Sequence, residues 1–205
     1  MSAKVSIDDR IHLAALQLFT HTGEIDISVS ELAQAAGVAR GTIYNNLGST
    51  KDLFAKIAAR LSVEMTSRIT TSLAGVEDPA MRLAIGIRLF VRRAHDEPAW
   101  GRFVNRYGLS SDSLKALWDG PTMDDVVRGI AAGRFTISEA QISSAMVMIG
   151  GSVLGAILLV LDGKSTWREA SDGVATLVLV ALGLSHEDAK NLASAPLPLL
   201  TSASH

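Results

Sequence analysis

Residues 28–47, SVSELAQAAGVARGTIYNNL, decide the fold expected for this chain. Ser28 and Glu31 form a capping box, which predicts a short helix over residues 29–36. That helix ends at Gly37, a residue that tolerates the left-handed backbone of a tight turn. The stretch after it has the length of a second short helix. Two short helices joined by such a turn form the helix-turn-helix pattern of DNA-binding proteins.

The second short helix has an unusual outer face. Ile43 and Leu47 are its large aliphatic residues, and their four-residue spacing lets them hold the helix to a core. Arginine and asparagine suit the edges of guanine and adenine, while tyrosine, threonine and lysine suit phosphates. By spacing alone, an ordinary solvated helix between two turns is an equally good interpretation. The positions expected to point outward are Arg40, Gly41, Thr42, Tyr44, Asn45 and Asn46.

The composition is that of a globular protein with a localised basic region. Of the 205 residues, 48% are apolar and 20% are charged, which permits a substantial core and argues against disorder. The net charge is −2, yet residues 38–60 hold four basic side chains against one acidic. Residues 111–205 hold six basic against ten acidic. A local basic patch can still bind phosphate, because screening confines electrostatics to about 10 Å.

The remaining chain reads as helices separated by caps, prolines and glycines, without the alternation typical of strands. We therefore expect an all-α protein. Its expected parts are a three-helix helix-turn-helix domain over 1–50, a connecting helix over 51–71 and a larger helical domain over 72–205. Within the larger domain, helices are expected at about 79–94, 97–108, 113–118, 121–132, 138–161 and 166–182. The tail, APLPLLTSASH, is expected to be loose.

Residues 140–161 form an uncharged run of 22 residues, long enough to cross a bilayer. Three glycines, several serines and acidic flanks at Glu139 and Asp162 favour a buried helix of a soluble protein instead. The chain has no cysteine, which excludes disulfides and fits a reducing cytosol. The first residues, MSAKVSIDDR, lack the apolar core of a signal peptide. We expect a cytoplasmic protein without a membrane span.

From Ile11 to Lys56 the chain resembles the tetracycline-repressor (TetR) family of bacterial transcriptional regulators. The matching elements are I-x-x-A-A-L-x-L-F at 11–19, S-V-S-E-L-A-Q-A-A-G-V-A at 28–39, R-G-T-I-Y at 40–44 and the pair Leu53-Phe54. The rest of the chain resembles the family only in layout, with a divergent helical domain that ends in two long helices.

The resemblance implies a set of DNA contacts. Arg40 and Thr42 would face the groove, Tyr44 would contact the backbone, and Asn45 would contact a base or a phosphate. Ser28 would cap its helix and touch a phosphate, and Ala39 would touch a thymine methyl group. Family members carry an aromatic residue and then a lysine after the recognition helix, where this chain has Leu47 and Thr50. Thr50 or the neighbouring Lys51 would replace that lysine.

The resemblance also implies a small-molecule effector in the larger domain and a homodimer through the helices at about 138–161 and 166–182. Gly150, Gly151, Gly155 and Ala156 would allow close approach of two copies, and Leu158, Leu177, Leu179 and Val180 would supply apolar area. Alternatively, these helices fill the core of one chain. The candidate ligand-binding residues, which core packing would also explain, are Trp100, Phe103, Tyr107, Trp118, Met123, Met146 and Met148.

Other classes of function find less support. Gly163-Lys164-Ser165-Thr166 resembles the end of a phosphate loop, but Leu158 stands where the first glycine should be and a helix precedes it. The five histidines lack metal-binding spacing, and we expect no cofactor and no enzyme activity. The function predicted is a dimeric, ligand-responsive regulator, a repressor that binds a palindromic operator in double-stranded DNA. The alternative is a helical ligand-binding or adaptor protein that has lost specific DNA binding.

Overall fold

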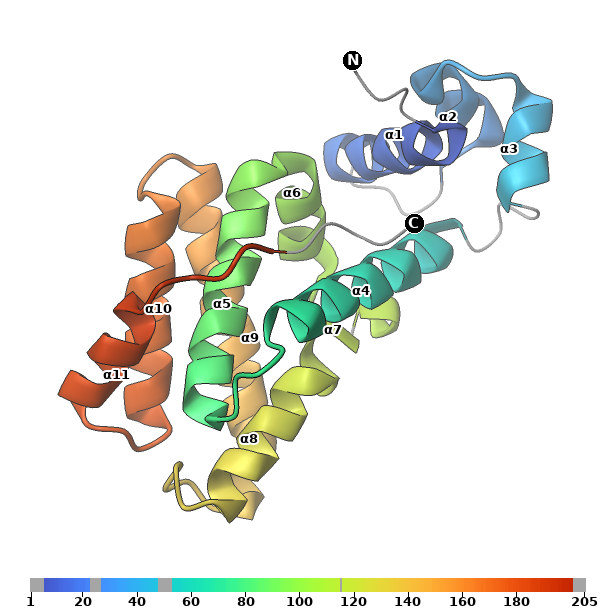
Figure 1. The fold of residues 1–205 in the computed structure, drawn as a ribbon. Helices are drawn as coiled ribbons and strands as arrows, with labels where there is room; N and C mark the ends of the chain where they lie inside the picture. The colour runs from blue at the N-terminus through green and yellow to red at the C-terminus, as the bar shows by residue number, and fades with distance from the viewer. Residues whose placement is uncertain (1–5, 23–26, 48–52, 115, 201–205) are drawn as a thin grey trace. The chain divides into compact units, whose positions relative to one another are not determined.

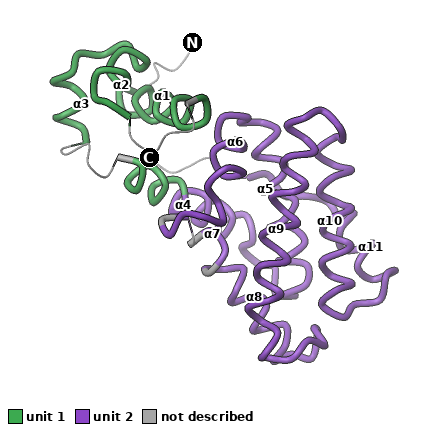
Figure 2. The backbone as a smooth tube through the Cα atoms, turned by 180° about the vertical axis from the view of Figure 1, so that it is seen from behind, with its two compact units in different colours: residues 1–61 green, residues 62–205 purple. Residues whose placement is uncertain are grey.

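The structure is a computed structural model that describes residues 6–22, 27–47, 53–114 and 116–200. The described residues form helices and connecting turns, with no strand among them (Figure 1). The chain divides into two compact units, residues 1–61 (unit 1) and residues 62–205 (unit 2), coloured separately in Figure 2. The boundary falls inside α4 (Leu53–Ser72), so this helix contributes to both units.

Unit 1 is built on α1, α2, α3 and the first part of α4. α1 packs against α2, and α2 packs against α3. The centre of its core is fully buried, with Phe19, Leu32 and Ile43 at 0% exposure. Phe19 meets Phe54 of α4 edge to face, with ring centroids 5.1 Å apart. The three N-terminal helices are α1 (Ile7–Thr22), α2 (Val29–Ala36) and α3 (Arg40–Leu47).

Unit 2 is organised around α5 (Pro79–Asp96), which packs against five other helices. Asp78 caps α5 and Pro79 occupies its first turn, where a missing N–H costs little. Figure 1 shows α5 running through the middle of this unit. The five helices around it are α6 (Pro98–Tyr107), α8 (Pro121–Ala131), α9 (Ile142–Leu161), α10 (Trp167–Ala181) and α11 (His186–Ser194).

Two of the predicted helices are divided in the structure. The segment expected to be one helix at 113–118 forms a 3-10 turn, Asp112–Leu114, and the short helix α7 (Ala116–Asp119). The long helix expected from 138 begins with a 3-10 turn, Glu139–Gln141, and continues as α9. Each change is a shift of local hydrogen bonding at a helix start, where 3-10 turns are common.

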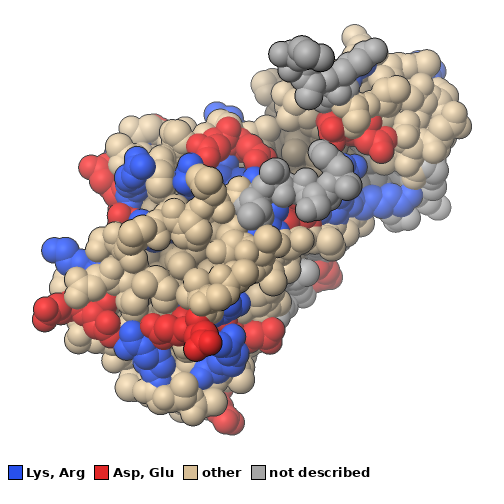
Figure 3. Space-filling model, viewed as in Figure 1, with Lys and Arg blue, Asp and Glu red and all other residues tan. Residues whose placement is uncertain are grey.

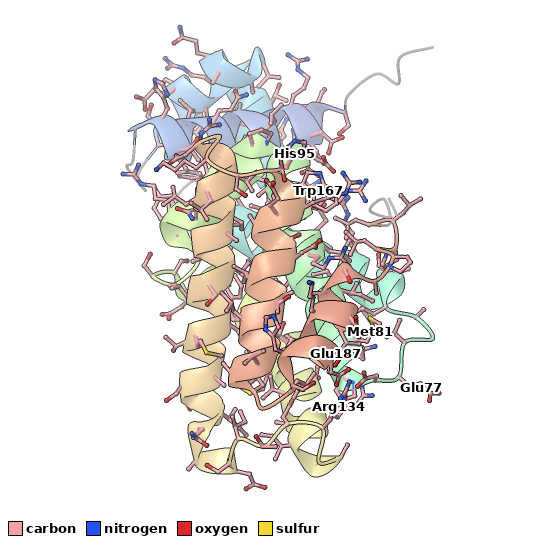
Figure 4. The ribbon with its side chains drawn as sticks, turned by 90° about the vertical axis from the view of Figure 1, so that its left-hand side faces the viewer. Glu77, Met81, His95, Arg134, Trp167 and Glu187 are labelled. Atoms are coloured by element: carbon pink, nitrogen blue, oxygen red, sulfur yellow. The ribbon has the colours of Figure 1, made fainter. Side chains whose placement is uncertain are left out.

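Arginines tie the elements of unit 2 together. Arg88 is buried and donates from Nε to Asp172 Oδ1 (2.7 Å) and from Nη1 to the carbonyl of Ala195 (2.6 Å). Arg134, labelled in Figure 4, bridges Asp78 at the start of α5 (3.2 Å) and Asp188 in α11 (2.6 Å). These pairs join segments that lie far apart in the sequence.

The prediction of a loose tail is wrong for residues 195–200. Ser72 Oγ donates to the carbonyl of Leu199 (3.0 Å), and Arg88 donates to that of Ala195. Pro196 and Pro198 have no backbone N–H, and side chains of α4 and α5 supply donors to two carbonyls of the segment. Residues 201–205 lie outside the described part.

The segment Glu139–Leu161 is long and apolar enough to cross a membrane. In the structure α9 packs against α5, α6 and α10, and Ile149, Val153 and Ile157 are buried among them. Figure 4 shows α9 and α10 side by side. One face of α9 is therefore a core face. The opposite face of α9 is exposed and also apolar, with Val147 at 67% and Leu158 at 47% exposure.

Replacing Gly37 by alanine should destabilise unit 1 by about 1–2 kcal/mol, because a side chain strains the left-handed backbone of the turn. Gly37 has φ of 63°, and an added Cβ would lie 2.8 Å from Nη2 of Arg10. Gly41→Ala is the matched control: Gly41 lies within α3 with no described atom near its Cβ position. That change should stabilise by up to about 1 kcal/mol. Urea unfolding followed by circular dichroism measures both, and equal effects would contradict the role given to the turn.

Candidate functional site

α3 presents one buried residue and a polar outer face. Ile43 is at 0% exposure, whereas the Tyr44 ring is 55% exposed. Arg40 and Asn45 are also exposed, and Thr42 is half-buried. The helix is thus held to unit 1 through Ile43, with Leu47 half-buried beside it. Its outer face carries the side-chain types that hydrogen-bond to base edges and phosphates.

The turn before α3 is fixed from two directions. Its own backbone bonds run from Gly37 N to the carbonyl of Gln34 (3.2 Å) and from Val38 N to that of Ala33 (3.0 Å). Arg10 of α1 approaches from outside and donates from Nη2 to the carbonyls of Ala36 (2.7 Å) and Gly37 (2.8 Å). Sequence reasoning missed Arg10, because nothing local marks an α1 side chain as a partner of carbonyls 26 residues away.

The capping box at the start of α2 is present. Ser28 Oγ accepts from Glu31 N (3.2 Å), and Glu31 Oε2 accepts from Ser28 Oγ (2.6 Å) and Ser28 N (3.0 Å). The bonds from the Ser28 hydroxyl and then from its backbone N–H lower the pKa of Glu31 below its ordinary value. Ser28 is therefore engaged within its own helix start, with its side chain exposed to solvent.

Some of the other residues expected to face DNA lie within the described part of the chain, and two lie outside it. Ala39 is exposed just before α3, and its carbonyl accepts from Thr42 N (2.9 Å), so it stands at the helix start without a capping side chain. Asn46, also expected to point outward, is exposed but donates to the carbonyl of Thr42 (2.8 Å). Thr50 and Lys51 lie outside the described residues.

The charges around α3 come from α4 and α1. Lys56 of α4 donates to the carbonyl of Leu47 (2.7 Å), which places an ammonium group at the C-terminal end of α3. Arg60 pairs with Asp9 of α1 at 3.6 Å, and both side chains remain largely exposed. On unit 2, Figure 3 shows basic and acidic side chains interspersed on the face in view.

Unit 2 contains a second candidate site, a narrow cavity of about 30 Å³. It is bounded by the last turns of α4 together with α5, α8, α9 and Trp118 of α7. Most of its wall is apolar. Aromatic rings form one wall, where Phe90 and Trp118 stack with centroids 5.4 Å apart. The polar part of the wall consists of Arg82, Thr122 and Asp125.

Asp125 is buried, at 3% exposure, and pairs with Arg82 at 2.5 Å. Burial raises the pKa of Asp125, and the hydrogen bond and charge of Arg82 oppose that rise. Arg82 also donates from Nη1 to the carbonyls of Val76 (3.2 Å) and Leu73 (3.4 Å), which fixes the guanidinium against the end of α4. The cavity therefore has one rigid, polar end.

Of the predicted ligand-binding residues, Trp118 lines this cavity. The others belong to the packed interior or lie beside it: Trp100 and Phe103 are almost fully buried, and Tyr107 and Met146 are buried. Met123 and Met148 are half-buried. Sequence reasoning missed Arg82, Gly86, Phe90 and Asp125. Arg82, Gly86 and Phe90 stand four residues apart on α5, a spacing that can be recognised in the sequence. Only the packing shows that this face of α5 meets a cavity.

Among the described residues, no histidine, aspartate or glutamate side chains group in threes that could hold a metal ion. The segment resembling a phosphate loop is the connection between α9 and α10, in which Thr166 caps α10 and Lys164 pairs with Asp162 (2.8 Å).

Two family models match the chain. Residues 11–57 match the bacterial regulatory proteins of the tetR family. Residues 78–195, more than half of the chain, match the tetracyclin repressor-like C-terminal domain. The chain belongs to the TetR family. This family consists of bacterial transcriptional regulators, and the predicted helix-turn-helix and all-α fold are confirmed.

Three known proteins are similar to this TetR-family chain in sequence or in fold. The uncharacterized HTH-type transcriptional regulator Rv1255c of Mycobacterium tuberculosis H37Rv is 35% identical over 91 residues, 44% of this chain and 45% of that protein. The crystal structure of RolR with resorcinol has a TM-score of 0.71 and 24% identity, covering 95% of this chain and 96% of that one. FadR from Bacillus halodurans has a TM-score of 0.72 and 21% identity, covering 90% and 100%.

The capping box predicts a pH dependence of stability. Because the folded pKa of Glu31 lies below its ordinary value of 4.5, the stabilisation is present above pH 4.5 and is lost as pH falls through the lower folded pKa. Glu31→Gln keeps the cap geometry without the titration. Its melting temperature, followed by circular dichroism from neutral pH to about pH 3, should fall less steeply than that of the unmodified protein. Glu187→Gln, at an exposed position of α11, is the control and should follow the unmodified protein.

Proposed function

We propose that the chain is a cytoplasmic, homodimeric repressor that binds a palindromic operator through α3 and leaves it when a small molecule binds unit 2. The observation that carries the proposal is the outer face of α3, where Arg40, Tyr44 and Asn45 are exposed around the buried anchor Ile43. A helix held by so little apolar surface has its polar face free for the major groove.

The proposed contacts divide by chemistry. Arg40 and Asn45 read base edges, because their fork and amide groups match guanine and adenine. Thr42 faces the groove beside Arg40, and Tyr44 binds the sugar–phosphate backbone and fixes the register of the helix. Ser28 contacts a phosphate from the start of α2, and Ala39 touches a thymine methyl group. Thr50 and Lys51 complete the proposed backbone contacts.

Arg40→Ala and Asn45→Ala should each weaken binding to the operator by about 1–3 kcal/mol, because each removes a base contact. The operator comes from selection of bound genomic fragments followed by footprinting, and affinity is measured by fluorescence anisotropy at fixed salt. Lys190→Ala, an exposed position of α11, removes the same charge as Arg40→Ala and should leave affinity unchanged. Unchanged affinity in both α3 variants would overturn the contact map. A protein that enriches no genomic DNA fragment would instead be the ligand-binding or adaptor protein that has lost specific DNA binding.

The homodimer is proposed to form through the exposed faces of α9 and α10. Val147 (67%), Leu158 (47%) and Leu177 (68%) are exposed apolar side chains on these helices. Gly151 and Gly155 of α9 are exposed too, so a partner backbone could approach closely. The residues expected at this contact but buried within the chain are Gly150, Ala156 and Leu179. A dimer supplies two recognition helices for half-sites about 34 Å apart or a multiple of that.

Leu177→Glu should convert the dimer to a monomer, because it places a charge in the middle of an apolar contact. Val63→Glu is the matched control, since Val63 of α4 is 69% exposed against 68% for Leu177. Sedimentation velocity of the two variants and the unmodified protein gives the oligomeric state. A Leu177→Glu protein that stays dimeric while Val63→Glu dissociates would place the interface elsewhere.

The release step is proposed to act through α4. Ile69 in the last turn of α4 and Leu73 just beyond its end form part of the cavity wall, so a ligand there would displace this end of the helix. An effector must bind the DNA-incompetent state more tightly, and a 100-fold preference corresponds to about 2.7 kcal/mol. Two proteins of similar fold support a ligand-responsive role: RolR with bound resorcinol, and FadR of Bacillus subtilis with bound stearoyl-CoA.

A further inference from the structure

One face of α5 sets the chemistry of the cavity from end to end. Arg82, Gly86 and Phe90 follow one another at four-residue intervals, and all three line the cavity. Residues four apart lie above one another on a helix, about 6 Å along its axis. The face therefore presents a polar group, a gap and an aromatic ring in a row about 12 Å long.

Gly86 creates the gap. It lies in the interior of an 18-residue helix, where alanine is a much better helix former. Glycine in a helix is often explained by a neighbour that leaves no room for a side chain. Gly86 has no such neighbour, because no described atom lies within 4 Å of the position its Cβ would take. The missing side chain leaves open space inside the cavity rather than a tight contact.

The polar end holds charges of both signs, with Arg82 and Arg128 beside Asp125 and with Asp124 close by. Arg82 Nε donates to Asp125 Oδ1 at 2.5 Å, and Arg128 approaches the same oxygen at 3.5 Å. Both of these bonds go to Oδ1, so Oδ2 of the carboxylate is the acceptor available to a ligand. A charged ligand would add a charge to a pair that is already neutralised in a buried place, which is unfavourable. An uncharged hydroxyl group can donate to the carboxylate without that cost.

The opposite end offers ring surface and no polar group. Phe90 and Trp118 stack at an interplanar angle of 27°. The indole Nε1 of Trp118 already donates to the carbonyl of Gly108 (2.8 Å), so its hydrogen-bonding capacity is used. The surrounding wall is aliphatic, with Ile149 and Val153 from α9. This end favours a flat apolar body, because aromatic pairs gain energy beyond area burial.

The available space limits the size of the ligand. The cavity of about 30 Å³ holds one or two water molecules. A dry cavity that binds benzene measures about 150 Å³, so a single ring enters only if the walls move apart to several times the present volume, and a fused ring or a long acyl chain would need a still larger opening.

We propose that the cavity binds a small uncharged phenol, with its ring over Gly86 and against Phe90 and Trp118, and its hydroxyl donating to Asp125. The inference rests on the proposed effector site of unit 2 and names its ligand class. Arg82 holds Asp125 in place and thereby orients the acceptor.

The first test compares three probes on the full-length protein by isothermal titration calorimetry: phenol, benzoate and toluene. Phenol is expected to bind saturably. Benzoate has the same ring with a negative charge, toluene has no hydroxyl, and each should bind at least about tenfold more weakly. No saturable binding of phenol, or equal or tighter binding of benzoate, would overturn the proposal. Tighter binding of toluene would overturn the role of Asp125.

The second test introduces a side chain at Gly86, where the cavity has open space. Gly86→Ala should raise the melting temperature by about 2–4 °C, since helix propensity improves, while phenol affinity falls. Gly86→Val should abolish phenol binding. Gly41→Ala is the control, because Gly41 is also helical with open space at its Cβ position but lies in unit 1. It should leave phenol binding unchanged. Unchanged phenol binding in Gly86→Val protein that retains its circular dichroism spectrum would place the site elsewhere.

The third test concerns the acceptor. Asp125→Asn keeps the shape and can still accept from Arg82, but offers no carboxylate to the phenol. It should weaken phenol binding by about tenfold without changing toluene binding.

Operator binding separates this inference from the proposed function. Phenol that binds in the cavity without releasing operator DNA would sustain the ligand class and overturn the release mechanism. If another small molecule releases the operator equally from the unmodified and the Gly86→Val proteins, the release mechanism is sustained and the ligand class is overturned.

Discussion

The angle of the turn at Gly37 is the constraint on which the function of unit 1 depends. It decides how α3 leaves α2, and therefore which side of α3 faces solvent. A left-handed glycine, two backbone bonds and two bonds from Arg10 fix this angle. Given that geometry, Ile43 alone reaches full burial from α3, and the polar residues around it need no partner inside the protein. A recognition surface can thus be rigid while making few apolar contacts of its own.

Unit 2 depends on a different feature, the packing of many helices around α5. Apolar burial supplies most of the favourable free energy, but buried arginines decide which segments meet. Arg93, at 3% exposure, pairs with Glu64 of α4 (2.9 Å) and Glu97 (3.1 Å), and Arg88 joins α10 to the tail. Ion pairs of this kind gain little net stability because desolvation offsets attraction, and their value lies in geometry.

The cavity and α4 are linked by the same side chains. Arg82 donates to the carbonyls of Leu73 and Val76 in the segment that follows α4, and it also forms the polar wall of the cavity with Asp125. A ligand that moves Asp125 or Arg82 therefore acts on the end of the connecting helix directly. Gly86 keeps the space in the cavity open but lowers the helix propensity of α5. This loss of local stability is of the kind that functional sites carry.

The sequence by itself determined the two short helices and the turn between them, because capping boxes, a glycine suited to a left-handed turn and four-residue apolar spacing are local rules. The matched family residues, rather than the spacing, decided between a helix-turn-helix and an ordinary solvated helix. The sequence also determined the TetR resemblance, the family that the matched residues confirm. Tertiary structure alone decided which face of α9 is buried, since that helix is apolar all round and its period carries no preference. It likewise decided that Arg10 meets the turn, that the tail binds α4 and α5, and that Gly86 faces a cavity. Those contacts join residues distant in sequence, and only the packed chain brings them within reach.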